Sequence, residues 1–316
     1  MPEAVLASER GFRHAPWWRS QAVADLCALA LRHGIETEYA RALVRSRRLL
    51  PQPAPLRLRE WPWPFHVHLL GGFQLLRQTV PVEFSGKAPG RPMELMKVLV
   101  ALGGQNVRAD QLADALWPHV DADYAHKSLT ATLHRLRRLL GDDEALVLRD
   151  ARLSLNPALI WVDTWALECV LAALDEALRA PPAEAGLPAL QALADETFAL
   201  YHGPFLPDES EQPSYIACRE QIRSRLLRCL GRVARRHEEA GQREAAVDCY
   251  LRIIEADALF EAPYRSLMQC YQRGADPSEA RATYERLRTV LSTRLKIMPS
   301  PETQAVYASL GAPAQS

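Results

Sequence analysis

The feature that most constrains how this chain of 316 residues can fold is a cluster of prolines between residues 51 and 64. Prolines alternate with other residues in Leu-Pro-Gln-Pro-Ala-Pro and again in Trp-Pro-Trp-Pro. Because proline fixes φ and lacks an amide hydrogen, neither a regular helix nor a central strand can pass through this stretch. We therefore expect a stiff linker that ends a separate segment, residues 1–60, and a new domain that begins at residue 61.

The segment before the prolines has a helical pattern. Apolar residues recur every three to four positions over residues 17–34, Gly34 is a C-cap, and a second helix is expected over 36–48. This predicts a helical connector. Four tryptophans border it: Trp17, Trp18, Trp61 and Trp63. We expect them to pin the connector against the neighbouring domain, and the alternative is a stacking platform for nucleic acid or a partner site.

From residue 65 the pattern changes to short strands. Alternating residues predict strands over 65–69, 73–77 and 80–84, and three-to-four spacing then predicts helices over 93–102, 110–117 and 123–140. Two further β segments, 145–149 and 152–155, surround an Asp-Ala turn. The order is three strands, three helices and a hairpin, which we assign to one domain over residues 61–160.

The rest of the chain is predicted to be helical from Trp165 onward. Two segments, 244–250 and 278–284, repeat with an offset of 34 residues, so that Ala246 corresponds to Ala280 and Tyr250 to Tyr284. A period of this length is typical of tetratricopeptide helix pairs, in which small residues allow close packing. We assign a helical repeat domain to residues 161–310 and expect a disordered tail at 311–316.

The helix over 123–140 carries the strongest functional signal. Leu129, Leu133, Leu136 and Leu140 fall on one stripe, which predicts the buried face. The opposite face and its flanks combine cations with short polar groups: Lys127, Ser128, Thr130, Ala131, His134, Arg135, Arg137 and Arg138. No carboxylate interrupts residues 124–140, so this face suits a DNA major groove, although a charged face is more often simply solvated. Arg108, Arg149 and Arg152 are further candidates for phosphate contacts.

Total charge is zero, but it is unevenly distributed. Residues 1–60 carry 10 basic and 6 acidic side chains, and residues 61–160 carry 11 and 10, so the remainder has a net charge of −5. A neutral total does not exclude DNA binding, because the relevant charge can lie on one helix face. No apolar run is long enough to cross a membrane and the first residues are unlike a signal peptide, which predicts a cytoplasmic protein.

Several motifs carry a family resemblance. Residues 90–95 (GRPMEL), 112–118 (LADALWP) and 133–141 (LHRLRRLLG) resemble the response-regulator type of winged helix in the antibiotic regulatory protein family. Residues 162–165 (VDTW), 200–207 (LYHGPFLP), 267–268 (LM) and 299–303 (PSPET) resemble landmarks of the bacterial transcriptional activation domain, which follows it in that family. Residues 17–64 resemble the connector that precedes this pair in large ATP-dependent regulators of the maltose-activator type.

The resemblance implies a mostly α fold with a small β part and a transcription activator that reads the major groove with residues 123–140. The implied partners are double-stranded DNA, RNA polymerase and a second copy of the chain on DNA, with no cofactor and no membrane. It does not imply ATP-driven switching, because Ser85-Gly86-Lys87-Ala88 lacks the phosphate-loop pattern. The alternative function is an adaptor that does not bind DNA and uses the helical repeats to bind proteins.

Other chemistry has weak support. His66 and His68 share one face of a strand, and His119 and His126 flank an acidic loop, but neither pair has a further metal ligand at a recognisable spacing. The six cysteines are dispersed, which is typical of reduced, buried thiols. No catalytic signature occurs, so we do not expect an enzyme.

Overall fold

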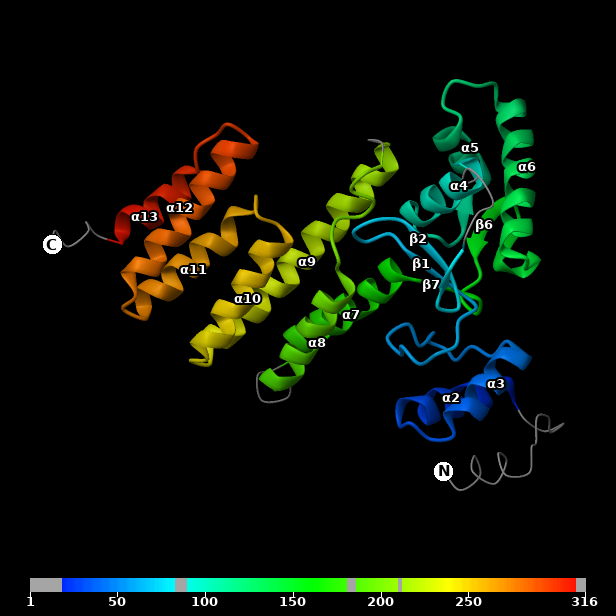
Figure 1. Cartoon of the computed structure of the whole chain (residues 1–316), viewed down its shortest axis with the longest axis horizontal. Helices are drawn as coiled ribbons and strands as arrows, with labels where there is room; N and C mark the ends of the chain where they lie inside the picture. Colours follow the sequence, from blue (N-terminus) through cyan, green and yellow to red (C-terminus); the bar gives the residue numbers. More distant parts are fainter. Residues whose placement is uncertain (1–18, 83–89, 181–185, 210–211, 311–316) are drawn as a thin grey trace. The chain divides into compact units, whose positions relative to one another are not determined.

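The computed structural model describes residues 19–82, 90–180, 186–209 and 212–310, and it is mostly helical with a small β part, as the sequence predicts (Figure 1). The chain divides into two compact units. The first combines residues up to 170 with residues 200–222, and the second combines residues 171–199 with residues from 223 onward. The division therefore falls within α7 (Asp163–Arg179) and within α9 (Pro213–Glu239).

The connector is a pair of helices, α2 (Ser20–Arg32) and α3 (Thr37–Arg47). Their apolar faces form one core with Leu58, Trp61 and Trp63 from the proline-rich stretch. The two tryptophans are each only 2% exposed. Their predicted role in holding the connector is confirmed, and a stacking platform on these two rings is wrong because ligands cannot reach them. Trp17 and Trp18 lie outside the described residues.

A four-stranded sheet follows, with the order β3-β2-β1-β7. Its strands are β1 (Phe65–His68), β2 (Gln74–Arg77), β3 (Val80–Pro81) and β7 (Ile160–Val162). The first three pair antiparallel, as the hairpin pattern predicts, whereas β7 pairs parallel to β1. The backbone of residues 69–71 is bonded to residues 204–206, which explains why residues 200–222 group with the first unit.

Three helices and a second sheet complete the winged helix. The helices are α4 (Gly90–Ala101), α5 (Ala109–Leu116) and α6 (Ala122–Leu140). The second sheet has the order β4-β6-β5, with β4 (Val107–Arg108), β5 (Leu146–Arg149) and β6 (Arg152–Leu155). A 3-10 turn, Asp143–Ala145, joins α6 to β5. The α4 helix is the centre of this domain, because Leu95, Met96 and Leu99 are fully buried.

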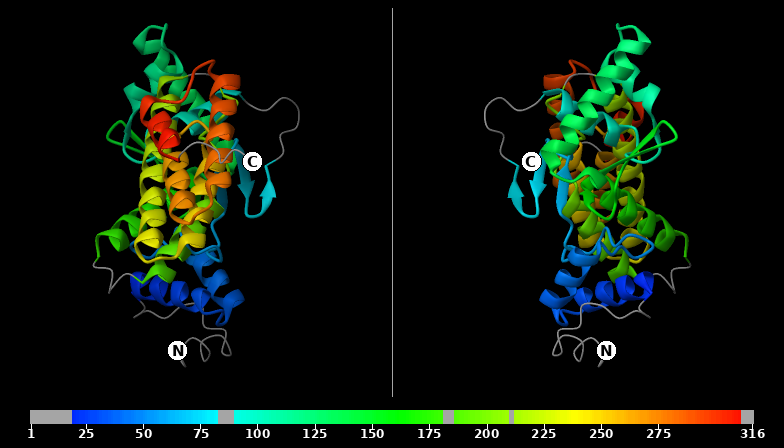
Figure 2. Two further views of the ribbon diagram at one scale, coloured as in Figure 1. Left: turned by 90° about the vertical axis from the view of Figure 1, so that its left-hand side faces the viewer. Right: turned by 90° about the vertical axis from the view of Figure 1, so that its right-hand side faces the viewer.

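The second unit is built from helix pairs. Besides parts of α7, α9 and α8 (Leu187–Leu200), it contains α10 (Arg243–Ala256), α11 (Glu261–Arg273), α12 (Pro277–Arg294) and α13 (Pro301–Ser309). Helix α11 packs against α10, α12 and α13, and the helices lie side by side in Figures 1 and 2. Ala246 and Ala280 are fully buried at equivalent positions of α10 and α12, which confirms the predicted repeat.

All six cysteines are free thiols. Burial raises the pKa of Cys27 and of Cys229 to about 11, which disfavours the reactive thiolate at neutral pH. Four of the six are buried and Cys169 and Cys218 are half-buried, which agrees with the interpretation as mostly buried thiols. Among the described helices, none is both long and apolar enough to cross a bilayer.

Candidate nucleic-acid interface

Helix α6 has two distinct faces. The predicted leucine stripe is buried, with Leu136 fully enclosed, and Ala125 and Thr132 extend it. The helix begins at Asp121, whose carboxylate accepts a hydrogen bond from the Asp123 amide at 3.0 Å, and it ends at Gly141 in the left-handed region with φ of 69°. These caps fix both ends of the helix, so the opposite face has a defined direction.

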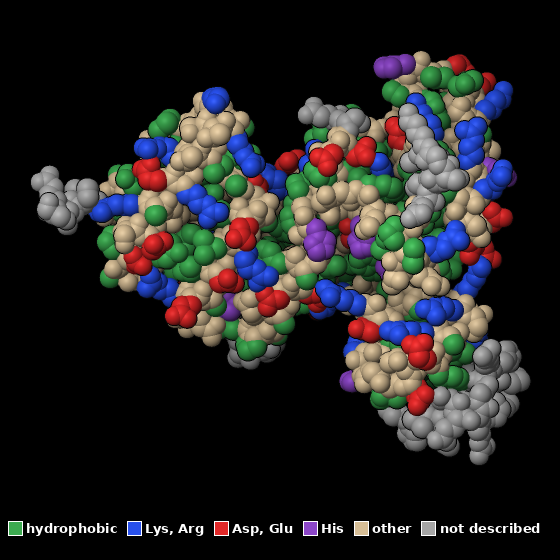
Figure 3. Space-filling view, viewed as in Figure 1, with side chains coloured by type: hydrophobic (Ala, Val, Ile, Leu, Met, Phe, Trp, Pro, Cys, Tyr) green, Lys and Arg blue, Asp and Glu red, His purple; other side chains and the backbone are tan. Residues whose placement is uncertain are grey.

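That opposite face is open to solvent. Its exposed members are Lys127, Thr130, Ala131, His134, Arg135 and Arg138, and Ser128 is half-buried at its edge. Among the residues that the structure describes, Lys127, Arg135 and Arg138 form no ion pair. Figure 3 shows basic side chains following α6 along the right-hand edge of the molecule. The helix therefore presents unpaired positive charge beside short polar groups.

Arg137 differs from the other predicted contacts. Its Nε and Nη2 atoms donate hydrogen bonds to the Leu146 carbonyl oxygen at 3.2 and 2.7 Å, and the side chain is half-buried. The guanidinium is thus directed toward β5 and joins α6 to the hairpin β5–β6. The structure gives Arg137 a role in positioning α6 rather than a place on the exposed face.

The second sheet carries a row of three arginines across β4, β6 and β5. Arg108 pairs in register with Arg152, and Arg152 pairs with Arg149, so the three residues form one rung across β4, β6 and β5. Paired residues on neighbouring strands lie on the same face, and all three side chains are exposed. The turn residues Asp150 and Ala151 both have positive φ, as a tight two-residue hairpin requires.

Two of these arginines have partners within the protein. Arg152 Nη1 donates a hydrogen bond to the Asn106 carbonyl at 2.9 Å. Arg108 pairs with Asp110, and this hydrogen bond holds the pKa of the Asp110 carboxyl below its usual range. Arg149 forms no ion pair among the described residues. The rung therefore keeps an excess of positive charge after these contacts are counted.

Residues remote in sequence support α6. Arg77 on β2 donates hydrogen bonds from Nη2 to the carbonyls of Leu139 and Leu140 at 3.3 and 3.0 Å, which satisfies carbonyls that the helix end leaves without partners. Arg48 of the connector binds Asp142 and Glu144 just after the helix. The sequence alone did not reveal Arg48 or Arg77, because nothing near either residue in sequence indicates a contact with α6.

The histidines considered above as metal ligands are not grouped with further ligands among the described residues. His66 and His68 lie beside Trp161, with ring centroids 5.6 and 5.3 Å from it, and burial lowers the pKa of both imidazoles. Within the described part of the chain, no group of three or more His, Cys, Asp or Glu side chains is arranged to hold a metal ion. The segment 85–88 lies outside the described residues.

Similarity to known proteins extends over most of the chain. A family model described as the bacterial transcriptional activator domain matches residues 162–310, and no curated protein matches. Among solved structures, the chain is similar to Mycobacterium tuberculosis EmbR in complex with a low affinity phosphopeptide, with a TM-score of 0.55 and 21% sequence identity. This similarity covers 78% of the present chain but 65% of EmbR, so the chain spans less than two thirds of that protein.

The two similarities concern complementary features. The family model identifies the sequence of the helical domain, and the likeness to EmbR shows the fold. Residues 162–310 therefore match the bacterial transcriptional activator domain, and the fold of the chain is similar to that of EmbR.

Proposed function

We propose that the chain binds a specific double-stranded DNA site and activates transcription from it. In this proposal α6 enters the major groove, and the residues nearest the bases are Lys127, Ser128, Thr130, Ala131, His134 and Arg135. The phosphate contacts come from Arg138 on α6 and from Arg108, Arg149 and Arg152 on the rung. Arg137 acts indirectly, because it holds α6 against β5.

The observation that carries the proposal is an excess of positive charge on two adjoining elements. Lys127, Arg135 and Arg138 on α6 form no ion pair among the described residues, and the second sheet carries three arginines in register. Like charges placed directly opposite each other on a sheet repel, and Arg152 has an arginine on both sides. A phosphate bound between the arginines would offset this repulsion. Without a bound anion, placing three arginines in register gives the protein no evident stabilisation. The exposed face of α6 adds short polar side chains, a residue type that can hydrogen-bond to base edges.

The other parts of the chain have distinct proposed roles. The winged helix at 61–160 reads DNA, while the helical domain at 161–310 offers an acidic surface to RNA polymerase or to a second copy of the chain. A single winged helix buries a modest area, so paired half-sites and a dimer on DNA are expected. The protein acts in the cytoplasm, where chromosomal DNA is, and it catalyses no reaction.

Selection of genomic DNA tests this function directly. The purified chain is mixed with genomic fragments at two salt concentrations, and retained fragments are sequenced. We expect a few fragments with a repeated half-site and retention that weakens steeply with salt, because phosphate contacts release counterions. Absent or indiscriminate retention would instead favour the adaptor function and direct attention to protein partners of residues 161–310.

Paired substitutions then test the assigned face. The double variant R135A/R138A should weaken specific binding and lower the slope of log K against log salt by about 1 for each phosphate that is no longer neutralised. The matched control is R294A/K296A, which removes the same charge from two exposed residues outside the winged helix. If both double variants bind like the unaltered chain, or lose affinity equally, α6 does not contact DNA as assigned.

A further inference from the structure

We propose that the connector α2–α3 is a working part of the DNA-binding unit, and that Arg48 is the residue that positions the end of α6. This inference rests on the proposed DNA-binding function, since α6 is the helix assigned to the major groove. It adds a role for residues before the winged helix, to which neither the family match nor the EmbR likeness assigns a function. Arg48 acts through other side chains and is not placed in contact with DNA.

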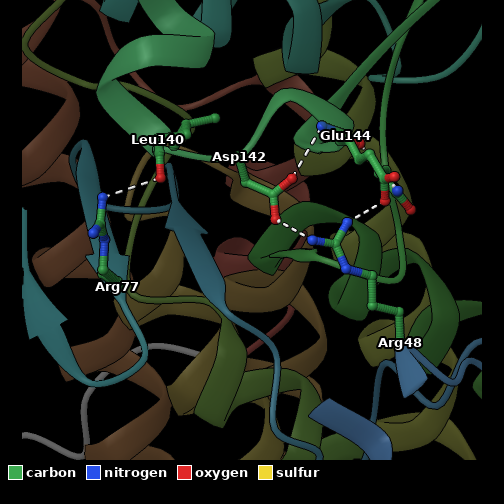
Figure 4. A network of polar contacts seen from close by, with 6 residues as sticks. Arg48, Arg77, Leu140, Asp142 and Glu144 are labelled. Atoms are coloured by element: carbon green, nitrogen blue, oxygen red, sulfur yellow. Dashed lines mark hydrogen bonds and ion pairs between the residues drawn. The ribbon is translucent and has the colours of Figure 1, made fainter. Parts of the chain in front are cut away.

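Arg48 bridges two carboxylates at the end of α6. Its Nη2 atom lies 3.0 Å from Asp142 Oδ2, while Nη1 binds the carboxylate of Glu144 (Figure 4). The other oxygen of Asp142 accepts a hydrogen bond from the Glu144 amide at 3.0 Å and so caps the turn that follows the helix. One guanidinium therefore holds two side chains that are already fixed in the turn between α6 and β5.

The connector itself is anchored to the winged helix. The indole of Trp63 donates a hydrogen bond to the Pro157 carbonyl at 3.0 Å, and that of Trp161 donates to the Leu56 carbonyl at 2.9 Å. These contacts join the two segments in both directions around the buried tryptophans. Arg48 thus extends from a fixed base, so its two ion pairs restrain α6 instead of following its motion.

The backbone of Arg48 is unusual for an arginine. Its φ and ψ are 48° and 45°, in the left-handed region, where it forms the C-cap of α3. Glycine is the usual residue at such a cap because a Cβ is sterically unfavourable there. Here the side chain at this position makes two long-range ion pairs, a gain that glycine cannot provide. A strained residue held by its surroundings is a reason to look for a role of its side chain.

The end of α6 also needs compensation of negative charge. Three carboxylates, Asp142, Asp143 and Glu144, follow the C-terminal end of the helix, where the helix dipole is already negative. Uncompensated, they would repel phosphates close to Arg138. Arg48 neutralises two of the three, and Arg77 binds the terminal carbonyls. The connector therefore supplies positive charge that adds to what the winged helix itself provides.

Single substitutions in the full chain separate positioning from charge. We expect R48A to weaken binding to the selected DNA site roughly 3- to 20-fold, the range that two partly exposed ion pairs support, with little change in the salt slope. The control R45A removes an exposed arginine of the same helix, which makes no ion pair among the described residues, and should change affinity less than about twofold. A third variant, R48G, removes the side chain and relieves the backbone strain.

Two further measurements make the test decisive. A double-mutant cycle combines R48A with E144Q. The loss of DNA-binding free energy in R48A/E144Q should be smaller than the sum of the losses in the two single variants, because the two residues act through each other. In the absence of DNA, amides at residues 138–146 should exchange hydrogen faster in R48A and R48G than in R45A. This difference should remain in R48G even if its global stability equals that of the unaltered chain.

The outcomes distinguish this inference from the proposed function. If the unaltered chain binds no DNA but R48A accelerates exchange at 138–146, the DNA-binding function fails and the positioning role stands. If R48A and R45A have equal affinity and equal exchange, the positioning role is overturned. A fall in the salt slope for R48A with additive effects in the cycle would also overturn it, because Arg48 would then contact phosphate directly.

Discussion

The buried carboxylate of Asp163 allows a quantitative prediction about pH. Asp163 begins α7, and one of its oxygens accepts hydrogen bonds from the amides of Leu69 and Leu70 at 2.7 and 2.8 Å. The side chain thus ties the end of β1 to the first turn of α7. Burial raises its pKa from 3.8 to about 6, although the amide hydrogen bonds oppose this shift. The charged form is therefore the less stable one in the folded protein.

The sign and size of the effect follow from linkage. Since the folded pKa lies above the unfolded value, the folded state binds the proton more tightly, and the resulting stability is complete below pH 3.8. It is lost as the pH rises through about 6. A rise in the pKa from 3.8 to about 6 contributes about 3 kcal/mol to the free energy of unfolding at low pH. About 2 kcal/mol of this contribution is lost between about pH 4.5 and about pH 7.5.

The substitution D163N removes this titration and keeps an oxygen that can accept the two amide hydrogen bonds. We expect the unfolding free energy of the unaltered chain, relative to D163N, to be about 2 kcal/mol higher at about pH 4.5 than at about pH 7.5. Urea unfolding followed by tryptophan fluorescence measures it, because Trp161 and Trp165 lie close to residue 163 in sequence. Comparing the two proteins at each pH cancels the other titrating groups. Parallel stability curves across this range would refute the reasoning.

Three further predictions concern the packing of the other elements. A280L should cost about 1–3 kcal/mol of stability because Ala280 is fully buried, whereas the exposed neighbour variant A282L should cost little, as thermal unfolding of the two will show. E261A should speed hydrogen exchange in α13, because the Glu261 carboxylate accepts hydrogen bonds from the Ser300 and Thr303 hydroxyls; E302A, at an exposed position, is the control. W63F should lower the free energy of unfolding by about 1 kcal/mol, because it removes the indole hydrogen bond to the Pro157 carbonyl; urea unfolding of W63F and of the unaltered chain measures the difference.

Elements with a local signal could be predicted from the sequence. The leucine stripe of α6 and the repeated alanines of α10 and α12 both lie within a few residues of the pattern that indicates them. Each periodicity directly reports which face is buried. The proline-rich stretch was also correctly predicted to be irregular, because proline acts on its own backbone.

Elements that depend on distant partners could not be predicted. Strand β4 has two residues and β7 has three, which is too short for an alternating pattern to be recognised. Both exist because a strand from another part of the chain pairs with them. The same limit hid the grouping of residues 200–222 with the first unit, since their backbone bonds go to residues 69–71.

The candidate site shows the same division between local and distant information. The sequence places Lys127, Arg135 and Arg138 on one helix face, and the structure leaves them exposed. It cannot show that Arg137, one position away, is turned toward the Leu146 carbonyl. A periodicity of about 100° per residue predicts the direction in which each Cα–Cβ bond leaves the helix. It does not predict where the end of a long side chain lies, because an arginine at the edge of a face can turn toward a nearby hydrogen-bond acceptor.

The arginine rung illustrates how a short strand can bring together residues that are distant in sequence. Arg149 and Arg152 are neighbours in the hairpin, so their proximity was predictable, but Arg108 joins them only because β4 pairs with β6. The pairing of β4 with β6 places three arginines in register on the second sheet, with Arg152 between the other two. Arg108 keeps its ion pair with Asp110 in this arrangement. The local pattern supplies the cations, and strand pairing brings them into the row from which the proposed phosphate contacts come.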